Sequence, residues 1–312
     1  MEVLGGTETD MLKTLKGGKL WLVTQPDHGQ IAGYLAAHWG NDHFKRPGHY
    51  ASAPDPERLR AETVFAVAQH DNGWWDWEAT PDLSESDGLP LGLAEVLKDQ
   101  QAGMNRWRLG LSRFEHAPYA NLLISRHAYW LYAIRALANP DPAFTHPLFW
   151  KGSPEKLYPG SREEPLKFIA ELEQLQAQWM ETLRADAATA GWLEPANFRP
   201  HERLLQLCDG LSLALSSALI PARTGETKGL GEDEFELRDV PRGGWNDRVT
   251  IGVSPRGAGR IELHPYPFDL DPLPVVMPAR IIQLPVERPH HFQTWWQAQP
   301  AQTLAFQCVA SR

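Results

Sequence analysis

The sequence predicts a mainly helical protein that ends in a small β-rich region. Helical periodicity dominates up to about residue 222, and short β-type runs bounded by proline and glycine follow from about residue 234. With 312 residues, 42% of them hydrophobic, the chain can bury a sizeable core. We expect a helical domain over residues 1–222 and a small β-rich region over residues 234–312, which an N-terminal hairpin at residues 11–25 could complete.

Five segments of the helical part carry an apolar stripe. They span about residues 26–39, 57–70, 119–138, 161–188 and 200–219. In each of them apolar residues recur three and four positions apart, which places them on one face of a helix. Residues 139–160 contain five prolines and are expected to form a connector or lid, because proline supplies no amide hydrogen to a helix or sheet.

The strand signals lie at the two ends of the chain. Gly17-Gly18 separates MLKTLK from KLWLVTQ, a pattern typical of a β-hairpin. Residues 224–233 are acidic and rich in glycine, which indicates a linker. The runs RVTIGV, RIELHPYPF and ARIIQLPV then alternate with proline and glycine, and each predicts a strand.

Charge and composition exclude several classes of protein. A formal net charge of -9 argues against a dedicated binder of nucleic acid or anionic membranes, because such proteins neutralise phosphate with lysine and arginine. Two cysteines are too few for a disulfide framework or a cysteine zinc site. The N-terminus lacks a secretion signal and no apolar run reaches 18 residues, so we expect a cytoplasmic protein with a small-molecule substrate. The oligomeric state is left open.

Two histidines are expected to point into the helical core near a carboxylate. His28 shares its predicted helix face with Ala32 and Leu35, so its imidazole points with the apolar stripe. His70 and Asp71 end an apolar helix, where adjacent side chains start only about 1.5 Å apart along the axis. Both of them can therefore reach one ion beside that helix.

Two further polar residues lie on buried helix faces. His127 sits among leucine, isoleucine and tryptophan at helical spacing. Asp209 lies between LLQLC and GLSLAL, where an unpaired carboxylate would cost several kcal/mol. A cation would solve this problem. Imidazoles and carboxylates together suit Mn, Fe, Ni or Zn better than Ca, and they could hold one or two ions.

Each of these residues taken alone is more often a hydrogen-bonded core residue than a metal ligand, and only their combination favours a metal site. Trp74 and Trp75 follow the His-Asp pair and either form an aromatic wall for a substrate or pack between helices. His116 precedes Pro118 in a loop and either joins His127 at the site or lies on the surface.

The order of these residues resembles the HD phosphohydrolase superfamily. The matching parts are His28, AVAQHDNG at residues 66–73 and CDGLSL at residues 208–213. The resemblance implies an HD-like helical bundle in which His28, His70, Asp71 and Asp209 bind one divalent metal. Trp74 stands where the family often has a lysine. TQPDHGQIAGYLAAHWG, HDNGWWDWE and LLISRHAYWL also resemble an uncharacterised, HD-related domain of unknown function, over most of the chain.

These features lead us to expect a divalent-metal-dependent hydrolase of a phosphorylated small molecule or nucleotide. Asp71 would ligate the metal and orient water, and His127 would act as general acid, bind phosphate or hold a second ion. One alternative is a di-iron oxygenase of the HD type, which requires at least two further histidines. His127 is the best placed of these, and His116, His146 and His201 are weaker candidates. Another alternative is a non-catalytic metal-binding or regulatory module.

Overall fold

The computed structural model places 47% of the chain in helices and 22% in one curled, mixed sheet of seven strands. The expectation of a mainly helical protein with a small β-rich tail is therefore wrong, because the sheet forms a substantial half-barrel. The structure describes residues 11–79, 81, 83–84, 89–91, 100–151, 161–283 and 292–311.

The five predicted helices are present, with ends displaced by a few residues. The helices are α1 (Gln25–Ala37), α2 (Pro56–Ala68), α3 (Trp75–Ala79), α5 (Gln100–Ser112), α6 (Pro118–Ala136), α8 (Glu163–Ala185), α9 (Pro195–Ser216) and α10 (Phe292–Ala298). Short 3-10 turns are η1 (Asn72–Trp74), η2 (Pro142–Phe144), η3 (Pro147–Phe149) and η4 (Ala190–Leu193). Sequence periodicity had not indicated α5. It had also placed Pro200 in the first turn of the last helix, whereas α9 begins at Pro195 and contains Pro200.

One sheet collects strands from both ends of the chain. The strands are β1 (Leu12–Lys16), β2 (Lys19–Val23), β3 (Phe235–Gly244), β4 (Asp247–Pro255), β5 (Arg260–His264), β6 (Leu273–Gln283) and β7 (Ala301–Ala310). Their order is β1-β2-β6-β7-β5-β4-β3, and only β5 and β7 pair in parallel. The predicted hairpin is confirmed, and it joins the sheet where Lys19 of β2 pairs opposite Gln283 of β6.

Distant pairings explain why the sheet was underestimated. The first part of β6 alternates, with Leu273, Val275 and Met277 buried and the residues between them exposed, whereas Ile281 and Ile282 near its end are both buried. Prolines interrupt the apolar pattern of this strand in the sequence. Its partners β2 and β7 come from opposite ends of the chain, and no local pattern encodes such a pairing.

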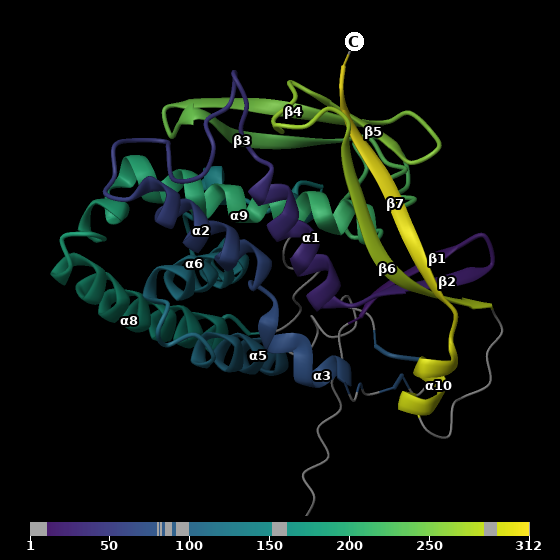
Figure 1. Cartoon of the computed structure of the whole chain (residues 1–312). Coiled ribbons are helices and arrows are strands. Elements are labelled where there is room, and N and C mark those ends of the chain that lie inside the picture. Colours follow the sequence, from purple (N-terminus) through teal and green to yellow (C-terminus); the bar gives the residue numbers. More distant parts are fainter. Residues whose placement is uncertain are drawn as a thin grey trace, which may run out of the picture.

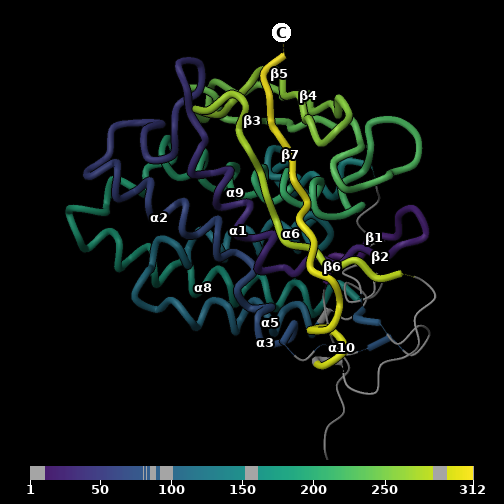
Figure 2. The backbone as a smooth tube through the Cα atoms, turned by 45° about the vertical axis from the view of Figure 1, so that its right-hand side comes forward, coloured from purple at the N-terminus to yellow at the C-terminus, as the bar shows by residue number. Residues whose placement is uncertain are grey.

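The sheet curls around two helices of the body. In Figure 1, β3 and β4 lie over α9, while β6 and β7 run down beside α1, and the turned view in Figure 2 keeps this arrangement. Contacts between α9 and β3 and between α1 and β6 agree with the pictures. Leu35, Leu211, Leu237 and Val275 share one hydrophobic core, so helices and strands on both sides of the loop after α9 pack together.

Close packing of α1 against α2 brings their histidines together. A Cβ atom at Gly33 would lie only 2.4 Å from the Cβ of Ala68, so any larger residue there would push the two helices apart. His28 lies in the first turn of α1, and His70 follows the end of α2. The glycine thus permits the approach on which the site depends.

Stacked rings attach the β3–β4 turn to the helices. Trp130 of α6 stacks on Phe144 with ring centroids 4.5 Å apart, and Phe144 stacks on Trp245 at 5.1 Å. The guanidinium of Arg199 lies 4.4 Å from the Trp245 ring, in cation–π geometry. The loop around Phe144 is therefore held between α6, α9 and the sheet.

Of the described helices, none has the length and apolar composition needed to cross a membrane.

Candidate metal centre

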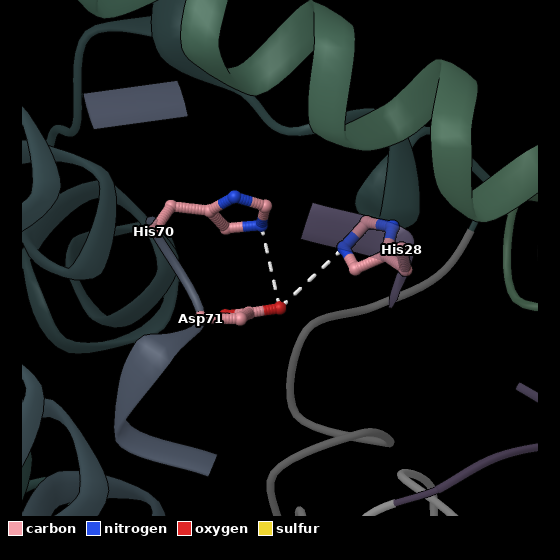
Figure 3. A group of neighbouring side chains, drawn as sticks. All are labelled: His28, His70 and Asp71. Atoms are coloured by element: carbon pink, nitrogen blue, oxygen red, sulfur yellow. Dashed lines mark ion pairs between the residues drawn. The ribbon is translucent and has the colours of Figure 1, made fainter. Parts of the chain in front are cut away.

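Four side chains that the sequence singled out meet where α1, α2 and α9 converge. The Nε2 atom of His28 lies 3.1 Å from Oδ1 of Asp209 and 3.4 Å from Oδ2 of Asp71. The Nε2 atom of His70 lies 3.3 Å from Oδ2 of Asp71 and 3.6 Å from Oδ1 of Asp209. Figure 3 shows both imidazoles turned toward Asp71. The donor atoms of His28, His70 and Asp71 lie within 4.8 Å of one another, and so do those of His70, His127 and Asp209.

Hydrogen bonds on the far side of each ring fix the tautomer of both imidazoles. Nδ1 of His70 lies 2.8 Å from the carbonyl of Val67, which can only accept, so this nitrogen carries a proton. The Ser212 hydroxyl donates its one hydrogen to the Asp209 carbonyl at 2.9 Å. Ser212 must therefore accept from Nδ1 of His28 at 2.6 Å. In their neutral forms both rings present a bare Nε2 lone pair to the site.

These nitrogens are aimed at the space between the carboxylates. Although Nε2 of His28 and of His70 each lie close to two carboxylate oxygens, neither makes a hydrogen bond. All four side chains are buried, and Asp71 is the most exposed of them at 9%. Two lone pairs and two negative charges that converge without a proton repel one another. The cluster requires positive charge at its centre, from protons or from a metal.

The pKa shifts of the four side chains also favour positive charge at the centre of the cluster. Burial disfavours the imidazolium forms of His28 and His70, but Asp71 and Asp209 outweigh burial and raise the pKa of both rings. Burial would also raise the pKa of Asp71 and Asp209, yet the surrounding imidazoles hold the pKa of both carboxyls well below the ordinary value. The site therefore favours ionised carboxylates around a cation.

The second oxygen of Asp209 faces two more histidines. Oδ2 lies 3.2 Å from Nε2 of His127, on α6, and 2.9 Å from Nε2 of His146, which caps η3. Burial outweighs the attraction of Asp209 and lowers the pKa of His127 to about 4, so this ring is neutral at ordinary pH. Nδ1 of His146 accepts the amide of Leu148 at 3.2 Å, so neutral His146 carries its proton on Nε2, facing Asp209.

His146 was only a weak candidate in the sequence, and its place is set by α9. Arg203 donates to the carbonyl of Thr145 at 2.9 Å, and Gln206 donates to the carbonyl of Phe144 at 2.8 Å. Arg203 also donates to a carbonyl of β3, so the same side chain ties this loop to the sheet. In the sequence, the feature that could have indicated the position of this loop was an arginine and a glutamine on one face of an apolar helix. The prolines around His146 had indicated only a connector or lid, part of which lies outside the described residues.

The predicted tryptophans differ in their surroundings. Trp74 is buried and packs edge-on against Trp107 with centroids 5.0 Å apart, and Trp107 in turn contacts the ring of His127 at 5.7 Å. Trp75 is 41% exposed and lies beneath the guanidinium of Arg113. Trp74 thus fits the packing alternative and buttresses His127 through Trp107, whereas Trp75 lies on the surface.

Two of the weaker histidine candidates lie away from the centre. His116 is exposed and lines a separate cavity of about 370 Å³ with Glu62 and Trp192. His201 is buried, with Nε2 accepting the amide of Gly48 at 2.9 Å and Nδ1 paired with the hydroxyl of Tyr119 at 2.7 Å. His201 is therefore a hydrogen-bonded core residue, and His116 is not brought to His127.

A buried cluster of four histidines and two aspartates, enclosed by helices and a curled sheet, defines a protein with a candidate metal centre. The chain belongs to the family described as "Protein of unknown function (DUF3891)", whose model matches residues 11–284. The matched segment contains all six residues of the cluster. No curated protein and no solved structure gives a significant match.

Replacing Gly210 by alanine should destabilise the protein. A Cβ atom there would lie 2.5 Å from Cγ of Pro147, so the loop that carries His146 would have to move away from α9. We expect a loss of about 1–3 kcal/mol in the free energy of unfolding, measured with denaturant. Gly252→Ala is the matched control, because its Cβ would meet nothing closer than 3.8 Å. Equal stability of the two variants would contradict this packing.

His201 should make the protein sensitive to acid. Burial lowers its pKa in the folded state to about 3, whereas a histidine in the unfolded chain titrates near 6.5. The folded state thus binds fewer protons than the unfolded chain. The free energy of unfolding therefore keeps its full value above about pH 6.5 and decreases as the pH falls below that value. Between pH 6.5 and 5 the wild type should lose about 1–2 kcal/mol more than His201→Gln does in denaturant unfolding. Parallel pH profiles would show that His201 is not responsible.

Proposed function

We propose that the chain is a metal-dependent enzyme whose ion is held by His28, His70, Asp71 and Asp209, and that it hydrolyses a phosphoester of a small molecule or nucleotide. The observation that supports this most strongly is the pair of imidazole Nε2 atoms that face two buried carboxylates, because a metal ion could replace the protons that these nitrogens otherwise bind. Ser212 and the Val67 carbonyl keep both rings in the tautomer that a metal ligand requires. The order of the four residues remains similar to that of HD proteins.

The donor set suits a transition metal. Two imidazole nitrogens with two carboxylates favour Mn, Fe, Ni or Zn, whereas Ca favours shells made of oxygen alone. When bound, such an ion lowers the pKa of a coordinated water and polarises a phosphoryl oxygen. Asp71 is the most exposed of the four proposed ligands.

The flanking histidines have different tasks in this proposal. His127 is neutral and its Nε2 faces the Asp209 carboxylate, so its buried, unpartnered Nδ1 can accept a hydrogen bond from a substrate hydroxyl. Its low pKa makes it a poor cationic acid but leaves it able to bind or orient a substrate. His146 places Nε2 2.9 Å from the second oxygen of Asp209, without the geometry of a hydrogen bond.

A di-iron oxygenase is the second candidate, and His146 is the observation that favours it. His146 stands beside His127 at Oδ2 of Asp209, so the two further histidines that such a centre needs are present. To ligate through Nε2, His146 would have to move its proton to Nδ1 and give up the Leu148 amide. A second ion is therefore expected to bind more weakly than the first.

Metal content per chain tests the proposed ligands. Protein purified without added metal or chelating resin should carry about one equivalent of transition metal by elemental mass spectrometry. The double variant His70→Ala, Asp71→Ala should carry none, because half of the donor set is lost. His116→Ala is the matched control, since this exposed histidine lies in a separate cavity, and it should keep the full content. Metal retained in the double variant would refute the assignment.

The reaction is tested on the same preparations. Phosphate release from a panel of phosphomonoesters and nucleotides, lost in the double variant, would support the hydrolase. Two equivalents of iron with oxygen consumption, and loss of one equivalent in His146→Ala, would support the oxygenase instead. Full metal content without turnover of either kind would leave a binding or regulatory module.

A further inference from the structure

A cavity of about 560 Å³ lies at the C-terminal end of α1. It is bounded by the loop from Trp39 to Arg46, by Arg60 of α2, by Gly243 of β3 and by Asp269 of the segment between β5 and β6. Its lining begins at Ala37, nine residues after His28, which is about 13 Å along the helix axis. The cavity is thus distinct from the metal centre, and its volume suits a small molecule.

Two residues that line the cavity carry hydrogen-bond donors that the protein does not satisfy. The guanidinium of Arg60 donates to the carbonyl of Ala37 at 2.5 Å, but its Nε is buried without an acceptor, and no carboxylate among the described residues pairs with it. Trp39, only 2% exposed, also lines the cavity, and its indole N–H has no acceptor. Buried donors without a partner are rare and costly, so an acceptor from outside is expected.

The nearby acids are largely committed to other partners. Asp269 pairs with His38 at 2.8 Å, and Glu57 pairs with Arg46 at 2.6 Å. Lys45, at the rim, bonds only to the carbonyl of Tyr50 at 3.4 Å and has no carboxylate partner among the described residues. Asp42, an exposed rim residue, is the one acid of the lining that forms no ion pair in the described part of the chain. The surplus donors and the positive charge of Arg60 and Lys45 favour an anion.

We propose that this cavity binds an oxyanion group, phosphate or carboxylate, of a small molecule. Arg60 would supply the charged donor at the base, because a guanidinium presents several N–H groups to the oxygens of such a group. Trp39 adds a neutral donor and Lys45 adds charge at the rim. Asp42 opposes binding. This site is independent of the metal centre and of the reaction proposed for it.

Calorimetric titration of the full-length protein with inorganic phosphate, and separately with succinate, tests the site. Arg60→Met should weaken binding at least tenfold and Lys45→Met about threefold, whereas Asp42→Asn should strengthen it two- to threefold, because these changes remove attraction or repulsion. Arg58→Met is the matched control on α2, since Arg58 lies over Trp192 beside a different cavity, and it should have no effect. Phosphate bound at the metal centre would be insensitive to all four changes.

A second measurement locates the ligand and does not depend on Arg60, whose loss removes a bond to α1. The indole ¹H–¹⁵N resonance that disappears in Trp39→Phe should shift on addition of the anion in the wild type, and Lys45→Met, a rim variant, should reduce that shift. A response to phosphate alone identifies a phosphate site, and a response to succinate alone identifies a carboxylate site. No binding of either anion, or binding that is the same in wild type, Lys45→Met and Asp42→Asn with no shift of Trp39, would overturn the proposal.

Discussion

The carboxylate of Asp209 is the constraint around which the rest of the structure is arranged. It is ionised and buried within α9, and four imidazoles from α1, the end of α2, α6 and the loop before η3 lie within 3.6 Å of its two oxygens. An isolated carboxylate in such surroundings would cost several kcal/mol, so each neighbour is required to be where it is. A displacement of any of these elements would remove part of the compensation for this buried charge.

The two oxygens of this carboxylate serve different environments. Oδ1 faces rings whose far sides are anchored by Ser212 and the Val67 carbonyl, so their lone pairs are directed at the centre. Oδ2 faces neutral His127 and His146, and Nδ1 of His146 accepts the amide of Leu148 on the far side of the ring. In the proposed function, the Oδ1 side of the cluster is already arranged to hold an ion, whereas the Oδ2 side would have to rearrange first.

The sheet contributes to the site although none of its residues belongs to the cluster. Arg203 bonds to the carbonyls of Thr145 and of Arg238 in β3, and so links the His146 loop to a strand. The stacked rings of Trp130, Phe144 and Trp245 secure the same loop from the other side. Because β6 also packs on α1, the half-barrel encloses the helices that carry His28 and Asp209. The helical body and the sheet therefore hold the residues of the cluster together.

Local pattern was enough to find the residues that lie on regular helices. His28, His127 and Asp209 fall on apolar stripes, and His70-Asp71 ends one, so helical periodicity alone predicts that they point inward. The structure does bring these five side chains together. Their metal-binding role remains a prediction, because burial shows where a side chain lies and not what it binds.

Tertiary structure alone decided the place of His146 and the form of the sheet. His146 follows a proline-rich stretch without periodicity, and it reaches Asp209 only because Arg203 and Gln206 hold the backbone on either side of Thr145. The half-barrel depends on β2 pairing with β6; the sequence had suggested that the hairpin could join the C-terminal strands, but not which strand it pairs with. Periodicity reports which face of an element is apolar, but pairing between distant segments depends on packing of the whole chain, and no single segment records it.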